Sequence, residues 1–178
     1  MDWNVVVSAS PGGYSRSRAL LREYGPVART HFYNILTMAV PSLPEFLAAL
    51  EDRFPLDVDL RACVSKIAPV TQAFNFTGVQ DFETKACAVA FTLAPALNGR
   101  SFHVRLHRHG LKGLISSPLE ERRLGEALMG ALESGGGHGM IRFEDPDFIV
   151  DLETVDERAG TAVWSRDDIR RYPFLKPD

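Results

Sequence analysis

A strict alternation of apolar and polar side chains between residues 101 and 107 constrains the fold of this chain more than any other feature. Because successive side chains of a β-strand point to opposite faces of the sheet, this pattern predicts a strand that buries one set and presents the other to water. The chain should therefore contain a sheet with one face exposed to solvent. The apolar set is Phe102, Val104 and Leu106, and the polar set is His103, Arg105 and His107.

Helical and strand patterns surround this strand in the second half of the chain. A capping box at residues 117–120, with Pro118 at the first helical position, predicts a helix that continues to Leu132. Asp81 is expected to cap an earlier helix that ends before Pro95. Apolar runs predict further strands at residues 140–143, 148–152 and 161–164.

The first half of the chain alternates strands and helices. A strand over residues 4–9 precedes a helix that Ser15 can cap, and residues 27–40 predict two strands joined by a turn near Asn34. Ser42 opens a further capping box and helix, and residues 60–70 are β-like again. The resulting order of strand, helix, strand, strand, helix, strand is that of a ferredoxin-like fold.

Together the two halves predict the α/β class in its α+β form, with a mixed sheet in the second half. We place a ferredoxin-like domain at residues 1–70 and a second domain at residues 71–178. The chain has 178 residues, of which 45% are hydrophobic and 24% are charged, so its composition is that of a globular protein with a buried core.

Composition also narrows the partners and the location. The chain has 20 Lys and Arg against 23 Asp and Glu, which gives a net charge of −3. The chain as a whole is therefore not basic, and any binding of nucleic acid would require a local patch of positive charge. Cys63 and Cys87 are too few for a disulfide framework or a cysteine zinc site, and they suit a reducing compartment. The sequence has no apolar run long enough to cross a bilayer and no secretory signal. We therefore expect no membrane association and a cytoplasmic location.

A local cationic patch lies between Arg100 and Lys112. These thirteen residues hold three Arg, one Lys and three of the five His of the chain, without Asp or Glu. Arginine forks bind phosphate oxygens and imidazole rings can stack on bases, a combination that suits RNA. The alternative is a solvated sheet face whose cations pair with acids from elsewhere in the chain.

Residues 101–112, with the sequence SFHVRLHRHGLK, resemble the central strand and turn of THUMP domains, the RNA-binding modules of tRNA-modifying enzymes. The helix after Leu119, the segment 145–150 and the closing residues 172–174 are similar to later landmarks of that domain. Residues 66–70 resemble the segment that precedes it. The resemblance covers nearly the whole chain and implies a THUMP domain over residues 71–178.

The resemblance implies tRNA binding, because THUMP proteins usually join this module to a domain that modifies RNA. The sequence has no pyrophosphatase-type P-loop, no glycine-rich methyl-donor turn after a strand and no zinc deaminase signature. It therefore resembles the stand-alone branch of the family and is similar to the adaptor that presents certain tRNAs to a separate cytidine acetyltransferase. By this resemblance we expect a non-catalytic adaptor that needs no cofactor and presents tRNA to a separate tRNA-modifying enzyme. His107 and His109 stand where the family often has Arg or Lys, which predicts weaker binding at neutral pH. The residues expected to bind RNA are Lys66, Arg100, His103, Arg105, His107, Arg108, His109, Lys112, Arg122, Arg123 and Arg166.

Other interpretations remain open at this point. His103, His107 and His109 could serve a small enzyme that uses a metal ion or acid–base chemistry on a nucleotide, although no third metal ligand is evident in the sequence. Phe74 and Trp164 could stack on RNA bases or belong to a core. Turn formation accounts for Asp145 and Asp147, and a buried structural role accounts for Cys87.

Overall fold

The computed structural model describes residues 2–177 and divides them into two compact units. Residues 2–71 and Ile169–Lys176 form the first unit, whereas Gln72–Asp168 and Pro177 form the second. The segment Ile169–Lys176 thus belongs to the first unit, although the sequence analysis placed it in the second domain. Each unit has its own sheet and helices, and the predicted α+β class is confirmed.

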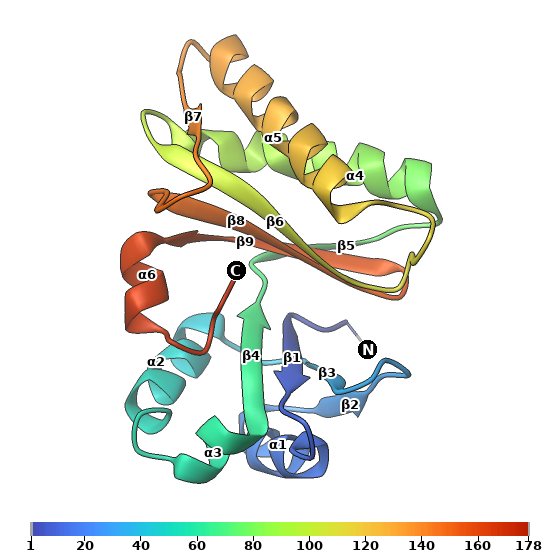
Figure 1. The fold of residues 1–178 in the computed structure, drawn as a ribbon, viewed down its shortest axis with the longest axis vertical. Coiled ribbons are helices and arrows are strands. Elements are labelled where there is room, and N and C mark those ends of the chain that lie inside the picture. The colour runs from blue at the N-terminus through green and yellow to red at the C-terminus, as the bar shows by residue number, and fades with distance from the viewer. Residues whose placement is uncertain (1, 178) are drawn as a thin grey trace. The chain divides into compact units, whose positions relative to one another are not determined.

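The first unit is built on a four-stranded sheet with the order β2-β3-β1-β4, in which all neighbouring strands are antiparallel. The elements follow the predicted ferredoxin-like order, with one additional short helix before the last strand (Figure 1). They are β1 (Val5–Ala9), α1 (Tyr14–Leu21), a 3-10 helix (Arg22–Tyr24), β2 (Val27–Arg29), β3 (Ile35–Met38), α2 (Leu43–Arg53), α3 (Val58–Cys63) and β4 (Val64–Pro69).

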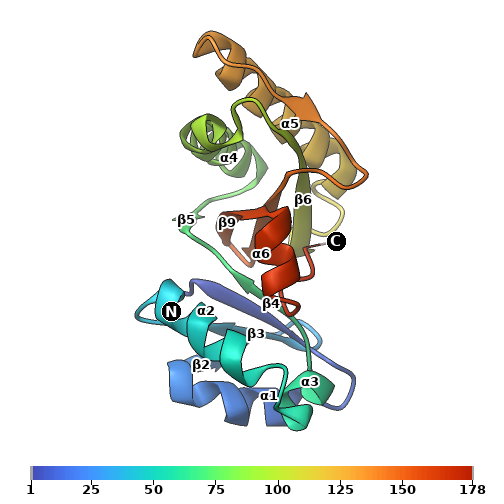
Figure 2. The same cartoon turned by 90° about the vertical axis from the view of Figure 1, so that its left-hand side faces the viewer.

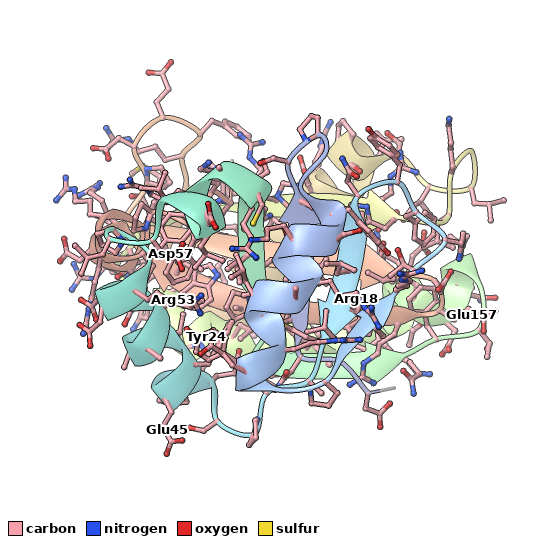
Figure 3. All side chains as sticks on the ribbon, turned by 90° about the horizontal axis from the view of Figure 1, so that it is seen from below. Arg18, Tyr24, Glu45, Arg53, Asp57 and Glu157 are labelled. Carbon is pink, nitrogen blue, oxygen red and sulfur yellow. The ribbon has the colours of Figure 1, made fainter. Side chains whose placement is uncertain are left out.

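The additional helix corrects the expectation that residues 60–70 form one strand. The carboxylate of Asp57 accepts a hydrogen bond from the backbone N–H of Leu60 at 2.8 Å and so caps α3. Arg53, the last residue of α2, contacts Asp57 at 2.8 Å and the Tyr24 hydroxyl at 3.1 Å. Figure 3 labels these three side chains. The strand therefore begins only at Val64.

The second unit contains a five-stranded mixed sheet with the order β5-β9-β8-β6-β7. Strand β6 runs parallel to both of its neighbours, β8 and β7, whereas the central strand β8 is antiparallel to β9. Figures 1 and 2 show α4 and α5 together on one face of this sheet. The elements are β5 (Gln72–Asn75), α4 (Val79–Leu93), a 3-10 helix (Ala94–Leu97), β6 (Ser101–His109), α5 (Ser117–Ser134), β7 (Met140–Ile141), β8 (Phe148–Val155) and β9 (Arg158–Ser165). The last helix, α6 (Arg166–Arg171), begins in the second unit and ends in the first.

The apolar side chains of β6 pack against these two helices as the alternation predicts. Phe102, Val104 and Leu106 are buried in one cluster with Leu128 of α5 and Phe82 of α4. The sheet face that carries the polar residues of β6 is therefore the face opposite α4 and α5.

The starts of three helices differ from the sequence-based expectations. Gly13, Gly78 and Ser116 occupy the N-cap positions of α1, α4 and α5, and none of these helices has a side-chain cap from the N-cap residue. The capping roles predicted for Ser15, Asp81 and Ser117 are therefore wrong in register, because each helix begins one to three residues earlier than expected. Ser42, in contrast, caps α2 as predicted, since its hydroxyl accepts from Glu45 N at 3.4 Å.

Within residues 2–177, none of the helices is both long enough and apolar enough to span a bilayer.

Candidate nucleic-acid interface

The polar face of β6 lies beside two acidic residues of β8. The parallel register pairs Arg105 with Asp151 and His107 with Glu153, so these side chains point to the same face of the sheet. Asp151 and Glu153 are buried, with 3% and 2% of their surfaces exposed. The sequence analysis did not identify either acid. Their alternation with Val150 and Leu152 was a visible signal, but the pairing of β8 with β6 could not be read from it.

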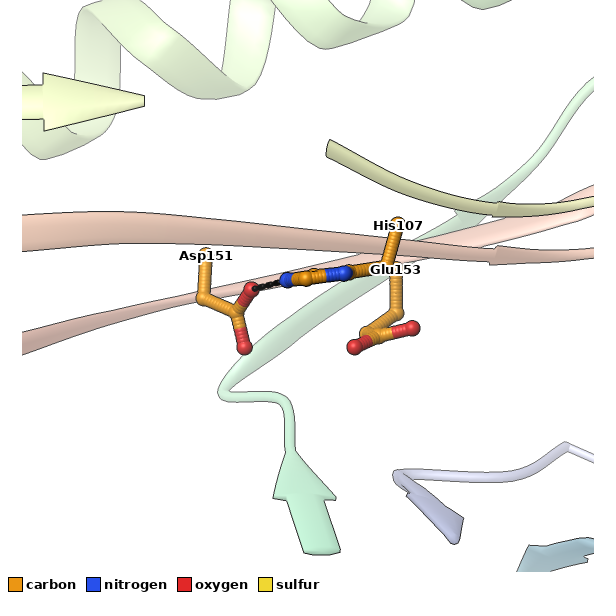
Figure 4. Close-up of side chains that lie close together, drawn as sticks. All are labelled: His107, Asp151 and Glu153. Carbon is orange, nitrogen blue, oxygen red and sulfur yellow. Dashed lines mark ion pairs between the residues drawn. The ribbon is translucent and has the colours of Figure 1, made fainter. Parts of the chain in front are cut away.

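His107 forms a cluster with both acids (Figure 4). Its Nε2 lies 3.4 Å from Asp151 Oδ1, and one ligand atom from each of His107, Asp151 and Glu153 lies within 4.8 Å of the others. One imidazole nitrogen and two carboxylate oxygens are a donor set that zinc or manganese accepts. The same Nε2 also lies 2.8 Å from the carbonyl oxygen of Pro177. Since a carbonyl only accepts, Nε2 carries a proton in this structure and offers no lone pair to a metal ion.

The structure therefore changes the histidine-based enzyme hypothesis. His109 Nε2 lies 3.6 Å from Glu153 Oε2, and His103 Nδ1 lies 3.1 Å from the backbone oxygen of Arg142. His107 and His109 thus share Glu153 as a neighbour, whereas His103 contacts a different part of the unit, and the described residues include no cluster of all three imidazoles. The further metal ligands that the hypothesis lacked do lie beside His107, but they are the carboxylates of Asp151 and Glu153 and not other histidines.

His103 is not at the surface, and the expectation that β6 presents it to water is wrong. Only 1% of His103 is exposed. Its ring stacks on Phe143, with 6.0 Å between the ring centroids and an interplanar angle of 23°. The segment that follows β7 covers this position, which the alternation within β6 could not reveal.

Several arginines predicted to bind RNA contact acceptors inside the second unit. Arg105 NH1 lies 3.8 Å from Glu121, and Arg123 pairs with Glu120 at 2.9 Å. Arg108 donates to the Ser117 hydroxyl at 2.9 Å and to the Leu111 carbonyl at 3.2 Å, and thereby holds the turn between β6 and α5. Arg166 lies 2.7 Å from Asp145 and 3.5 Å from Asp147. The alternative of cations that pair with acids therefore applies to much of the predicted cationic patch.

The remaining predicted cations lie in different environments. Lys66 is buried in β4 of the first unit, at 9% exposure. Arg122 is exposed and pairs with Glu126 at 2.9 Å. Because both side chains are in solvent, Arg122 can leave Glu126 for another anion at little cost in free energy. Arg100 and Lys112 are exposed. Within residues 2–177 neither side chain has a hydrogen bond or ion pair, so both can reach an external phosphate.

Asp147 is a structural acid. Its carboxylate accepts from the backbone N–H of Ser101 at 2.9 Å and from the Ser101 hydroxyl at 2.8 Å. These two hydrogen bonds hold the pKa of the Asp147 carboxyl below its ordinary value; burial opposes them, and the charges of Arg166 and Arg100 add smaller lowering effects. Asp147 therefore joins the start of β6 to the turn that precedes β8, a long-range contact that the local turn interpretation did not predict.

The aromatic candidates divide between core and partial exposure. Trp164 is buried at 7% exposure, and Phe74 packs against the core cluster of the second unit. Cys87 is partly exposed and receives a contact from Arg123 NH1 at 3.5 Å.

No protein-family model and no curated protein matches the sequence. Solved structures do match the fold. TrmN from Thermus thermophilus gives a TM-score of 0.61 at 21% identity, over 89% of this chain and 44% of its own. A 4-thiouridine synthetase, solved in complex with RNA and with ATP bound, gives 0.53 at 11% identity, over 90% of this chain and 41% of its own. SMU.472, assigned as a methyltransferase and solved with SAH, gives 0.52 at 14% identity, over 90% of this chain and 41% of its own.

This chain thus spans about two fifths of the length of these three structures and shares their fold over that part. Methyltransferases and methylases recur among the matches. The comparison contradicts the expectations of a non-catalytic adaptor and of a protein without an enzymatic role, because most of these matching structures are described as enzymes. The matches likewise give no support to a separate partner enzyme.

Proposed function

We propose that this chain recognises tRNA within an enzyme that transfers a methyl group to it, so that binding and catalysis belong to the same protein. The observation that carries the proposal is the fold, because about nine tenths of the chain superposes on TrmN and on a 4-thiouridine synthetase solved with RNA. The resemblance of residues 101–112 to the THUMP strand and turn supports RNA binding by the second unit.

The charge distribution of the second unit supports the same function. Arg100 lies at the start of β6 and Lys112 in the turn that follows it. Both are exposed, and neither is neutralised by an ion pair among the described residues. Positively charged side chains at such positions attract the phosphate backbone and make binding dependent on salt. We therefore place the main phosphate contacts at Arg100 and Lys112, with Arg122 as an exchangeable third.

Binding of tRNA at several salt concentrations, measured by fluorescence anisotropy, tests the proposal. Replacing Arg100 and Lys112 together by Gln should weaken binding severalfold and lower the slope of log affinity against log salt by about 2, since each phosphate contact contributes about 1. In a methyl-transfer assay of the enzyme, the same variant should raise KM for tRNA with kcat unchanged.

Lys85→Gln is the matched control, because it removes one positive charge from α4, where Lys85 is paired with Asp81 at 2.7 Å. It should leave the salt slope unchanged. Absence of tRNA binding by the unmodified protein at low salt would contradict the proposed function. Equal effects of the control and of the double variant would contradict the placement of the contacts.

A further inference from the structure

A pocket of about 490 Å³ opens beside the edge of β6, within the second unit. Its walls come from β6, from α5 and from the segment after β7, and its lining includes Val104, Gly125, Ile141 and Phe143. A cavity of this volume lies in the range that small organic ligands occupy, which is about 300–1,000 Å³.

The pocket exists because β7 is short. β7 pairs only with Ser101 and Phe102, and one further bond joins Arg142 N to Phe102 O at 2.9 Å. Beyond that point the edge of β6 faces α5, and Glu121 Oε1 accepts from Leu106 N at 2.9 Å. Gly125 lets α5 approach β7, since a Cβ there would lie 3.2 Å from Ile141 Cδ1.

An aromatic ring marks the mouth of this pocket. Phe143 is 70% exposed, although a large apolar side chain normally avoids water. His103 lies in a stack with Phe143 and is itself held by the carbonyl of Arg142 at 3.1 Å. The buried imidazole of His103 thus positions the ring of Phe143, which still presents most of its surface to solvent. Exposed rings of this kind stack on unpaired nucleobases.

Charged side chains surround the ring. Arg122 and Glu126 form an exposed pair, with 78% and 62% of their side chains in solvent, so either can turn to a ligand at small cost. Arg142 is exposed next to Phe143. Arginine can hold a phosphate, and a carboxylate can accept from the exocyclic amine of a base.

The pocket is less suited to an added protein strand. A strand that extended the sheet at β6 would need the backbone N–H of Leu106, and this group already donates to Glu121. The remaining opening is mostly apolar and has charges of both signs at its rim, a combination that fits an aromatic heterocycle joined to a phosphate.

We propose that this pocket receives one unstacked nucleobase of a single-stranded RNA segment, with the base against Phe143 and the flanking phosphates near Arg122 and Arg142. This inference rests on the proposed function, because it assumes that the second unit binds RNA. It names a site for the base that is separate from the phosphate contacts at Arg100 and Lys112.

Short single-stranded RNAs with one 2-aminopurine, placed at each position in turn, test the inference on the full chain. Stacking in the pocket should quench the fluorescence at one position. Phe143→Leu keeps the apolar volume but removes the ring, and should abolish that quenching and weaken binding about 5- to 100-fold, as loss of one base stack does. Gly125→Leu, which fills the pocket from a helical position, should have the same effect with Phe143 intact.

Phe91→Leu is the control, because Phe91 is an aromatic residue of α4 that is 58% exposed. It should change neither quenching nor affinity. Quenching that persists in both pocket variants overturns the inference. A pocket variant that binds RNA normally but changes the sedimentation of the protein also overturns it, since a protein partner would then occupy the site. If the unmodified protein binds RNA without quenching at any position, the pocket assignment fails while the proposed function stands. If it binds no RNA at all, the proposed function fails first.

Discussion

Asp147 shows how a single residue fixes the geometry around the candidate interface. The two hydrogen bonds from Ser101 to its carboxylate hold the first residue of β6 next to the entry to β8. Arg166 approaches the same carboxylate at 3.5 Å. Because these donors favour the charged form, they stabilise the fold only while Asp147 is ionised.

Asp147→Asn should therefore lower the thermal midpoint of the protein most strongly at neutral pH. The pKa of Asp147 is lowered in the folded protein. The stability that it contributes is thus complete above the unfolded pKa of about 4 and is lost as pH falls through the folded value. Thermal denaturation of both proteins from pH 7 to pH 2.5 should show their midpoints converging in acid.

Asp145→Asn is the neighbouring control. Asp145 also pairs with Arg166, but 68% of its side chain is exposed, so the effect should be smaller at every pH. A difference between Asp147→Asn and the unmodified protein that grows in acid would contradict this account.

At the scale of elements, each helix start depends on where the chain enters the helix as well as on local residue type. Ser42 caps α2 because its extended backbone points the hydroxyl back at Glu45 N. Ser117 has the same residue type and a similar pattern after it, but it lies inside α5, where its hydroxyl accepts from Arg108. The same motif thus forms a cap in one helix and a contact with the preceding strand in the other.

Ser42→Ala should lower the free energy of unfolding by about 0.5–2 kcal/mol, because it leaves an N–H of the first turn without its side-chain acceptor. Urea denaturation followed by circular dichroism measures this difference. Ser15→Ala removes a serine from the first turn of α1 that is not its cap, and it should change the free energy by less than about 0.5 kcal/mol. Equal losses in the two variants would contradict the assignment of the caps.

At the scale of the whole molecule, the segment Ile169–Lys176 returns to the first unit. Phe174 is fully buried, and its ring packs edge-on against Phe54 with 5.4 Å between centroids. Its carbonyl accepts from Ile67 N at 2.8 Å, and Arg171 pairs with Glu51 at 2.7 Å. Residues 72–168 of the second unit thus lie, in the sequence, between the two segments of the first unit, which end at Thr71 and resume at Ile169.

Phe174→Ala should therefore destabilise the first unit by about 3–5 kcal/mol, because it removes a buried ring and leaves a cavity. Each unit contains one of the two tryptophans of the chain, Trp3 in the first and Trp164 in the second. Urea unfolding can thus be followed separately through Trp3 in a Trp164→Phe background and through Trp164 in a Trp3→Phe background. We expect the larger shift in the Trp3 signal, and a larger shift of the Trp164 signal would contradict the unit boundaries.

The sequence alone determined the features that depend on neighbours along the chain. The alternation in β6 identified its buried face, the order of strands and helices identified the α+β class, and Ser42 identified the start of α2, because periodicity and capping act over a few residues. Only the tertiary structure decided what lies against those residues. The pairing of β8 with β6 places Asp151 and Glu153 beside His107, and the segment after β7 buries His103. Contacts between residues far apart in the sequence depend on the order and register of strands across the whole sheet. A local sequence pattern specifies neither the order nor the register.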